Sequence, residues 1–218
     1  MPSTPLPCGD WETIGPDLTG PASFIAALAR TPSDTSTLWV ATRAGKVYVS
    51  TNADAAASAV AFTRLDTSAP NAPPRFVSGI VVDPANPRHV WISYAGYSST
   101  VAVPPAPPNR PGHVFEVTWD GAATAVWTPA DDGVGPIGDL PINGIARDDA
   151  NGDLYAASDF GVVRRVAGTT HWHVAAPGMP TVEVAGLTLN TAGRVLYAAT
   201  HGRGGFRLAL RGSGQRDE

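Results

Sequence analysis

A fourfold internal repeat is the feature of this sequence that most constrains its fold. Each copy begins with an apolar residue, a variable residue, a small residue and Leu or Ile, at residues 25–28, 77–80, 142–145 and 184–187. A second segment that opens on an aromatic residue follows, at residues 39–42, 91–94, 155–158 and 197–200. From the Leu or Ile to the aromatic residue there are 11 positions in the first two copies and 10 in the last two. Such regular self-similarity indicates one pair of strands used four times, in a propeller or an array.

Two further strands are predicted in each copy. The third strands are expected at residues 47–49, 114–117, 162–166 and 206–210, and the fourth at residues 62–65, 126–128 and 172–174. The last copy lacks a fourth strand, but residues 11–14, which begin with Trp11, precede the first copy. We therefore predict an all-β fold, a four-bladed β-propeller whose N-terminal strand pairs with residues 206–210 and closes the last blade. The pattern also fits the tail of a larger propeller, with Trp11 finishing a blade that lies outside this chain.

The length and composition suit one all-β domain. The chain has 218 residues, and it contains 23 Gly and 21 Pro but only 16% charged residues, as expected for short strands joined by tight turns. We predict an N-terminal arm over residues 1–9, a single propeller over 10–210 and a C-terminal tail over 211–218. Residues 97–112 form the one long insertion, and its prolines favour a stiff wall or lid beside one blade.

Charge and motifs exclude several classes of function. A net charge of −4 offers no electrostatic reason to expect nucleic acid or an anionic membrane surface as a partner, and no apolar run is long enough to span a membrane. The single cysteine, Cys8, cannot form an intrachain disulfide. There is no phosphate-binding Gly-rich loop and no serine nucleophile motif, and His171 with His173 makes only half a metal site. We expect a monomer without a cofactor or a metal.

The repeat segments resemble the propellers of the BNR/Asp-box superfamily, which includes sialidases, xyloglucanase-type glycosidases and sortilin-like domains. The resemblance is carried by residues 38–54 (LWVATRAGKVYVSTNAD), 76–84, 152–162 and 196–204. The whole chain looks most like the C-terminal blades of large secreted bacterial BNR-repeat proteins, often described as glycosyl hydrolases. The resemblance implies secretion, although the N-terminus shows no signal peptide. One departure is clear: of the turn-stabilising Asp-box, only the start is present, as Ser50, Thr51 and Asn52.

Candidate ligand-binding residues follow from the propeller prediction. The turns between second and third strands share one face of a propeller, around the mouth of the central channel. Four residues after the aromatic residue of each second strand, the sequence places Arg43, Ala95, Asp159 and His201. Near these turns the second copy adds Tyr94 and Tyr97, and the fourth copy adds Arg203. We predict that these polar side chains converge on a ligand at the channel mouth; the alternative is that they cap turns and pair with one another.

The resemblance and the acidic residues together suggest a glycan as the ligand. Glycoside hydrolysis needs two carboxyl groups on either side of the scissile bond. The expected face offers Asp159 with Asp139 or Glu183 as a pair, from a wider set of Asp66, Asp131, Asp132, Asp139 and Glu183. His201 could exchange a proton, Arg43 and Arg203 could bind ligand oxygens, and Tyr94 and Tyr97 could stack on sugar rings. The predicted function is a glycoside hydrolase-like, carbohydrate-active propeller; the alternative is a non-catalytic glycan- or protein-binding module, possibly part of a larger enzyme.

Overall fold

The computed structural model describes residues 11–69, 72–97, 112–131 and 137–210, and nearly all of its regular structure is β. The predicted arm and tail, Cys8, Asp132 and most of the 97–112 insertion lie outside these ranges. The helical elements described are two short 3-10 turns, Ala57–Ala59 and Asp66–Ser68. No helix in the described ranges is long and apolar enough to cross a membrane.

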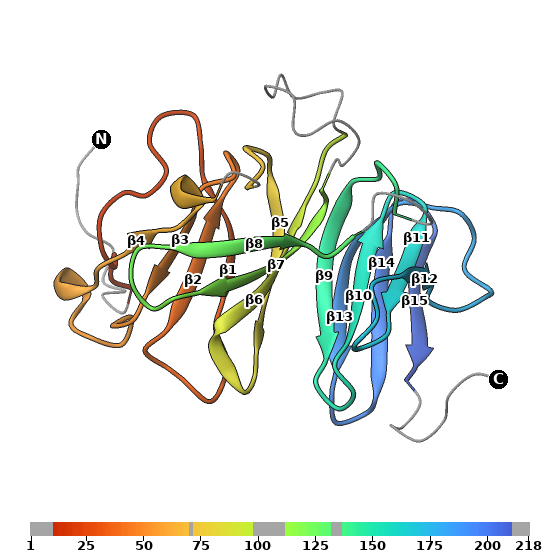
Figure 1. Cartoon of the computed structure of the whole chain (residues 1–218). Coiled ribbons are helices and arrows are strands. Elements are labelled where there is room, and N and C mark those ends of the chain that lie inside the picture. Colours follow the sequence, from red (N-terminus) through yellow and green to blue (C-terminus); the bar gives the residue numbers. More distant parts are fainter. Residues whose placement is uncertain (1–10, 70–71, 98–111, 132–136, 211–218) are drawn as a thin grey trace, which may run out of the picture.

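The strands form four antiparallel sheets, each built from consecutive strands, and these are the four blades of a β-propeller (Figure 1). The first blade contains β1 (Ile25–Ala29), β2 (Leu38–Thr42), β3 (Val47–Ser50) and β4 (Thr63–Arg64). The second contains β5 (Val77–Asp83), β6 (Asn86–Tyr94), β7 (Val114–Trp119) and β8 (Ala125–Pro129). The third contains β9 (Ile142–Asp148), β10 (Asp153–Ser158), β11 (Gly161–Arg165) and β12 (Trp172–Val174). The last contains β13 (Val184–Asn190), β14 (Val195–Thr200) and β15 (Gly204–Ala209). The predicted four-bladed propeller is therefore confirmed.

The inner strands β1, β5, β9 and β13 pack against one another in this order. In each of them the pairing register shifts at the variable position of the repeat, which is occupied by Ala26, Ser78, Asn143 and Ala185. This shift is a β-bulge, and a bulge re-aims the extra side chain. The small residue that follows permits close packing: a Cβ on Gly79 would lie 3.1 Å from Ile145 Cγ2 of the next blade.

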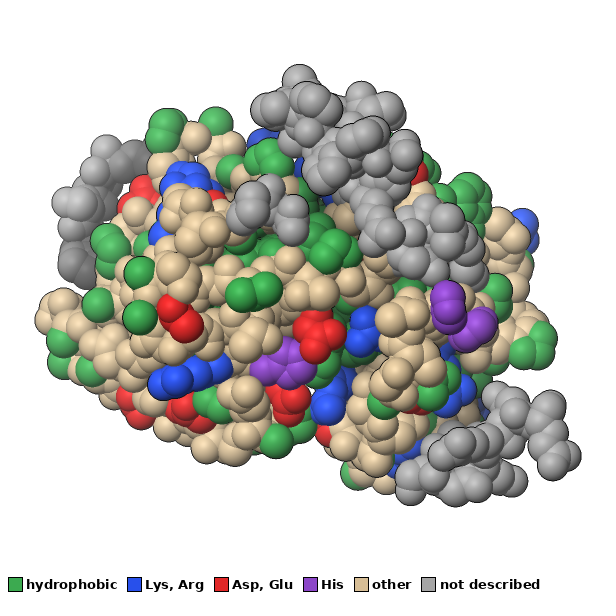
Figure 2. Space-filling view, viewed as in Figure 1, with side chains coloured by type: hydrophobic (Ala, Val, Ile, Leu, Met, Phe, Trp, Pro, Cys, Tyr) green, Lys and Arg blue, Asp and Glu red, His purple; other side chains and the backbone are tan. Residues whose placement is uncertain are grey.

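A polar triad crosses the second blade near the hairpin that joins β5 to β6. His89 on β6 lies between Asp83 on β5, with Nδ1 3.0 Å from Oδ2, and Glu116 on β7, with Nε2 2.7 Å from Oε1. Figure 2 shows acidic, basic and histidine side chains gathered near the middle of this face of the molecule. The hydrogen bond to Glu116 is the main cause that raises the pKa of His89, and hydrogen bonding to His89 lowers the pKa of Glu116. Both shifts show that the folded protein favours a charged triad.

Changing His89 to Gln is expected to reveal this triad as a pH-dependent contribution to stability. Because the pKa of His89 is raised on folding, its contribution is complete below the ordinary pKa of 6.5 and is lost as the pH rises through the raised value. The free energy of unfolding of His89→Gln should therefore be about 1.5 kcal/mol below that of wild type at about pH 5.5. At about pH 8.5 the difference between the two proteins should be smaller. Urea denaturation at the two pH values measures the difference. An equal loss at both would contradict a charged His89.

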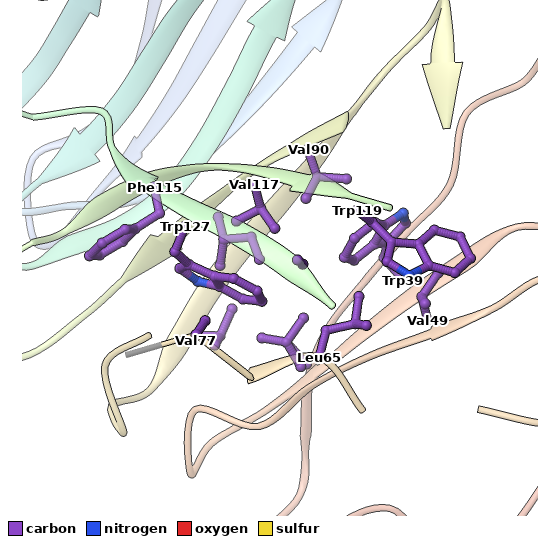
Figure 3. Close-up of a cluster of buried hydrophobic side chains, with 14 of the residues drawn as sticks. Trp39, Val49, Leu65, Val77, Val90, Phe115, Val117, Trp119 and Trp127 are labelled. Carbon is purple, nitrogen blue, oxygen red and sulfur yellow. The ribbon is translucent and has the colours of Figure 1, made fainter. Parts of the chain in front are cut away.

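Apolar side chains fill the spaces between successive blades. The largest group described lies between the first two blades, and Figure 3 shows its tryptophans, Trp39, Trp119 and Trp127, among smaller aliphatic residues. Trp39 is fully buried, its ring meets Trp119 edge to face at 6.3 Å, and its Nε1 donates a hydrogen bond of 2.8 Å to the carbonyl of Pro87. Trp39, Trp91 and Tyr155, which open the second strands of the first three blades, are thus packed between their own blade and the next, whereas Tyr197 of the last blade is 43% exposed.

The remnant of the Asp-box stabilises one turn of the first blade. Ser50 Oγ donates to Asn52 Oδ1 at 3.0 Å, and the Asn52 amide group bonds to the backbone of Ala59 and Ala61 at 2.8 and 3.0 Å. These bonds tie together the two ends of the connection between β3 and β4. An asparagine here therefore organises a turn without the carboxylate of the full motif.

The last blade differs from the prediction, because the segment at Trp11 does not complete it. Its sheet has three strands, residues 11–14 form no strand, and Trp11 is 95% exposed. Residues 15–19 are bound to the first blade instead, by hydrogen bonds from Gly15 N to Ala57 O (3.2 Å), Tyr48 Oη to Leu18 O (3.0 Å) and Lys46 Nζ to Thr19 O (3.3 Å). The first and last blades lie at opposite ends of the molecule in Figure 1, so this attachment holds Trp11 away from β15.

Candidate functional site

The turns between second and third strands lie along one edge of the propeller, opposite the hairpins that join first to second strands (Figure 1). The position four residues after the aromatic residue of the second strand makes the same backbone hydrogen bond in three blades. Arg43 N, Ala95 N and His201 N each donate to the carbonyl just before the first strand of their own blade, at 3.0, 2.9 and 2.9 Å. The repeat therefore presents its variable side chains at the same place in successive blades.

Three polar side chains from the second and third blades form a hydrogen-bonded group on this face. Tyr97 Oη donates to Asp159 Oδ2 at 2.9 Å, and Asn143 Nδ2 donates to Asp159 Oδ1 at 3.1 Å. The same Asn143 amide donates to the carbonyl of Val184 in the last blade at 3.2 Å. We name Tyr97, Asn143 and Asp159 the Asp159 group. It connects three successive blades, and Tyr97 in it is 37% exposed.

The bulge of the inner strand explains why Asn143 can reach the next blade. In the preceding blade Ser78 occupies the same bulge position, and its hydroxyl donates to the carbonyl of Ile142. Ser78 and Asn143 thus both bond to the first carbonyl of the following inner strand. Because Asn143 has a longer side chain with two N–H groups, it can also hold Asp159. Sequence reasoning missed Asn143, although its place at the variable position of the repeat could have indicated it.

Asp139, another acidic residue of the predicted site, is bonded to a buried histidine. Asp139 Oδ1 is 3.0 Å from Nε2 of His113, which is completely buried, while the Asp139 side chain is 45% exposed. Burial lowers the pKa of His113. The pKa of Tyr97 is raised, chiefly by its hydrogen bond to Asp159 and in smaller part by the charge of Asp139. Of the predicted residues, Tyr97 and Asp159 are therefore joined directly by a hydrogen bond, and Asp139 is bonded to His113 instead.

Glu183 and His201 form a separate exposed pair in the last blade. Glu183 Oε2 is 3.0 Å from His201 Nδ1, with the two side chains 45% and 79% exposed. Glu183 directly precedes Val184, whose carbonyl accepts from Asn143, so this pair adjoins the Asp159 group along the chain. Arg203 is exposed in the turn between β14 and β15. Arg43 lies in the first blade, where its guanidinium is 3.5 Å from the carbonyl of Ala22.

Tyr94 does not lie at the channel mouth, contrary to the prediction. It is completely buried, with its ring edge to face with Phe115 at 5.7 Å and its hydroxyl accepting from Trp127 Nε1 at 3.3 Å. Burial raises its pKa. β6 lies between the first and third blades, so Tyr94 belongs to the core and cannot stack on a sugar.

Two further acidic residues of the predicted set have structural bonds. Asp66 Oδ1 accepts from the backbone N–H of Val47 at 2.9 Å. Asp131 Oδ2 accepts from the N–H groups of His113 and Val114, at 2.7 and 2.8 Å. In both blades an aspartate that follows the fourth strand thus bonds to the start of the third. Sequence analysis could not separate these aspartates from ligand-binding ones.

A buried arginine that sequence reasoning did not single out lies beneath this face. Arg75 is 4% exposed and donates to the carbonyls of Gly96 and Gly112, at 3.2 and 2.5 Å. These two glycines lie at either end of the insertion after β6. Burial lowers the pKa of Arg75, and the charges of Asp139 and Asp131 oppose this effect. Arg75 thus joins the two ends of the insertion.

A metal site is not evident within the described ranges, where no group of three or more His, Cys, Asp or Glu could hold an ion. His173, one half of the predicted histidine pair, lies on β12 with its side chain exposed.

Comparison with known proteins places the fold among β-propellers. No family model matches the chain, and no curated protein matches it. Among solved structures, it is similar to the Cps50 (Swd1) β-propeller domain of Myceliophteria thermophila, with a TM-score of 0.54 and 15% identity over 81% of this chain and 49% of that one. It is also similar to an ancestral GH74 enzyme, with a TM-score of 0.51 and 21% identity over 81% of this chain and 22% of that one.

A third similar structure is an auxiliary nutrient binding protein from Bacteroides thetaiotaomicron, with a TM-score of 0.56 and 13% identity over 81% of this chain and 36% of that one. The chain thus spans less than half the length of each of these three structures. Because all three identities are low, the likeness concerns the fold and not the activity. Together with the four sheets described above, it establishes that the chain has the β-propeller fold.

Proposed function

We propose that this protein is a carbohydrate-active propeller that binds a glycan at the face carrying the Asp159 group. The observation that carries the proposal is the hydrogen-bonded arrangement of Tyr97, Asp159 and Asn143, drawn from two blades and joined to a third. A ligand site in a rigid protein is typically a few polar groups held in fixed positions beside an apolar or aromatic surface. Tyr97 provides that surface, since more than a third of the residue is exposed.

The chemistry of this face suits polyhydroxylated ligands. A sugar hydroxyl both donates and accepts, and here carboxylates of Asp139, Asp159 and Glu183 can accept while the His201 imidazole can do either. A tyrosine ring presents an apolar surface and a polar tip together, so it can contact the ring and the hydroxyls of one sugar. Two of the similar structures, a GH74 enzyme and a nutrient binding protein, support a ligand of this kind.

Glycoside hydrolysis is a second candidate for the same face. It requires one ionised carboxylate and one carboxylic acid. Asp159, which accepts hydrogen bonds at both oxygens, suits the ionised role, and Asp139, whose charge contributes to the raised pKa of Tyr97, is a candidate for its partner. Glu183 is the alternative partner. A protein-binding role without catalysis is the third possibility, and it predicts no glycan binding.

The test is to change Asp159 to Asn and measure glycan binding and glycoside turnover. The change keeps the size of the side chain but removes the charge of the carboxylate, and the Tyr97 hydroxyl would have to accept a hydrogen bond from the new amide instead of donating one. A glycan array first identifies a glycan that the wild-type protein binds, and calorimetry then measures its affinity for both proteins. The affinity of Asp159→Asn should be lower by about tenfold or more. If the protein is a hydrolase, turnover of chromogenic glycosides should be lost as well.

The matched control is Asp54→Asn. Asp54 is an exposed aspartate of the first blade that accepts from Thr35 Oγ1 at 3.2 Å, so the substitution has the same chemistry at a distant place. Binding by this variant should equal that of wild type. A wild-type protein that binds no glycan on the array and cleaves none would contradict both carbohydrate proposals and leave the protein-binding role.

A further inference from the structure

A cavity with a volume of about 210 Å³ lies between the third blade and the last. We call it the last-blade pocket. Phe160 and Val174 line it and are 58% and 68% exposed, so it is reached from solvent. An apolar cavity of about 150 Å³ can hold benzene, so this pocket is large enough for an aromatic ring. Its deeper walls are mostly apolar and include Val162, Ala175, Met179, Leu196, Ala198 and Phe206.

The equivalent place one blade earlier is filled by an indole ring. Trp172 of β12 is buried there, between the second blade and the third, and its Nε1 donates to the carbonyl of Ala130 at 2.9 Å. The ring therefore comes from the fourth strand of its own blade and bonds to the end of the fourth strand of the preceding blade. The apolar residues grouped with it include Val114, Ala130, Leu154, Ala156 and Val163.

The wall formed by the preceding blade is the same in both places. Ala130, which follows β8, donates its backbone N–H to the carbonyl of Val114 at 2.8 Å. Ala175, which follows β12, donates its N–H to the carbonyl of Val162 at 2.9 Å. In the last-blade pocket, Ala175 and Val162 thus hold the positions that Ala130 and Val114 hold beside Trp172. The carbonyl of Ala175 is therefore the expected acceptor for a ring N–H in this pocket.

The wall formed by the following blade corresponds as well. Ala156 pairs with Val163 across β10 and β11, and Ala198 pairs with Phe206 across β14 and β15. Both alanines directly follow the aromatic residue of the second strand, so the two pairs hold the same place in successive blades. The last-blade pocket is therefore the site at which the repeat places the aromatic ring of a fourth strand.

The edge of β15 can receive such a strand. Among the described residues, β15 pairs with β14 alone. Just after β15, Leu210 N donates to Arg194 O on the β14 side. Because the hydrogen-bonding groups of an antiparallel strand alternate between its two sides, the N–H and carbonyl groups of Gly205 and Arg207 point away from β14. A row of such groups at a sheet edge is a template for another strand.

We propose that the last blade binds an extended segment of a partner protein as its fourth strand, with a tryptophan side chain of this segment in the last-blade pocket. The site continues the interface between the third blade and the last, and the other blades show what occupies it. Backbone bonds to β15 supply affinity and the pocket supplies specificity, as in other sheets that bind a peptide at an edge. In each of the first three blades an aromatic residue stands three positions before the residue whose N–H bonds back to the third strand: Phe62 and Leu65, Trp127 and Ala130, Trp172 and Ala175.

Trp11 of the same chain does not supply this ring. Residues 15–19 are bound to the first blade, at the opposite end of the molecule from β15 (Figure 1). The last-blade pocket contains none of the three residues of the Asp159 group, and the proposal does not depend on glycan binding there.

The test titrates the wild-type protein with a peptide that has the sequence of residues 169–176 (TTHWHVAA), which contains β12. The readout is the NMR signal of isotope-labelled methionine methyl groups, because Met179 lines the pocket and the only other methionine, Met1, is an internal control. An aromatic ring in the pocket is expected to shift the Met179 resonance in a saturable way. The same peptide with alanine in place of tryptophan should bind about tenfold more weakly or worse, and so should N-acetyltryptophanamide, which has the ring without the strand.

Two variants at one position of β15 test the strand. Arg207→Pro removes an N–H that points away from β14, and it should weaken peptide binding by about tenfold or more, since proline is tolerated at an edge but cannot donate. Arg207→Ala is the matched control, because it removes the same side chain and keeps the N–H; it should bind the peptide as wild type does. If Arg207→Pro fails to fold, the titration of wild type still decides.

Any of four results would overturn the proposal. A Met179 resonance that does not move with the peptide would mean that no ring enters the pocket. Equal affinities for the peptide and for N-acetyltryptophanamide would make the pocket a site for a free aromatic molecule. Equal affinities for the tryptophan and alanine peptides would mean that the pocket selects nothing. Self-association of wild type that Trp11→Ala abolishes would identify a second copy of this chain as the occupant.

Discussion

Replacing Trp39 by alanine is expected to lower the free energy of unfolding by about 3–5 kcal/mol, the usual cost of removing a buried tryptophan. Trp39 is fully buried, packs edge to face with Trp119 and bonds through Nε1 to Pro87 in the neighbouring blade. The substitution would leave a cavity between two blades and a buried carbonyl without its donor. Urea denaturation followed by circular dichroism measures the loss.

Trp11→Ala is the matched control for this prediction, since it makes the same chemical change at a side chain that is 95% exposed. Its effect on the free energy of unfolding should stay within about 0.5 kcal/mol. A large loss in Trp11→Ala would support the closure of the last blade by the N-terminal segment, against the three-stranded sheet of the structure. A small loss in Trp39→Ala would mean that the blades do not depend on one another for stability.

Changing Arg194 to Met is expected to cost about 3–5 kcal/mol, because it leaves the buried Asp148 carboxylate without its charged partner. Asp148 lies at the end of β9 with no exposed surface, and both of its oxygens accept from the Arg194 guanidinium, Oδ2 at 2.6 Å. Arg194 belongs to the hairpin between β13 and β14, so the pair joins the third blade to the last. It has φ +51°, and Met has the same branching at Cβ, so the backbone strain is unchanged.

Arg30→Met is the control here. Arg30 is exposed, and its guanidinium bonds only weakly to the carbonyl of Thr35, at 3.4 Å, so the change should cost less than about 0.5 kcal/mol. Adding Asp148→Asn to Arg194→Met should restore part of the stability, because the buried group is then neutral. Equal stabilities of Arg194→Met and Arg30→Met would contradict the inference that this ion pair holds the last blade in place.

The strands of this protein could be predicted from local sequence, because each is short and is marked by its own pattern. The aromatic residue at the start of the second strand packs against the next blade in the first three blades, so the pattern repeats with the packing. In the last blade Tyr197 is 43% exposed and a Cβ on Gly186 would meet no atom within 4 Å. The predicted and observed strands agree to within a few residues; for example, residues 172–174 were expected and Trp172–Val174 is found.

The N-terminal segment shows where that reasoning fails. A short run beginning with Trp11 has the composition of a fourth strand, but a strand at the edge of a sheet exists only if a neighbouring edge is within reach. Hydrogen bonds from Tyr48 and Lys46 to Leu18 and Thr19 hold the segment on the first blade. Such contacts link residues 27 to 30 positions apart through tertiary structure, and no local pattern encodes them.

The sequence by itself determined the number of blades, the order of their strands and the turns at which variable polar residues appear, because these depend on periodic burial and turn chemistry. Only the tertiary structure decided which of those residues meet. Tyr97 and Asp159 are 62 positions apart, and Asn143 reaches Asp159 because a bulge and the packing of one inner strand on the next direct its side chain. The same packing buried Tyr94, whose ring meets that of Phe115 edge to face.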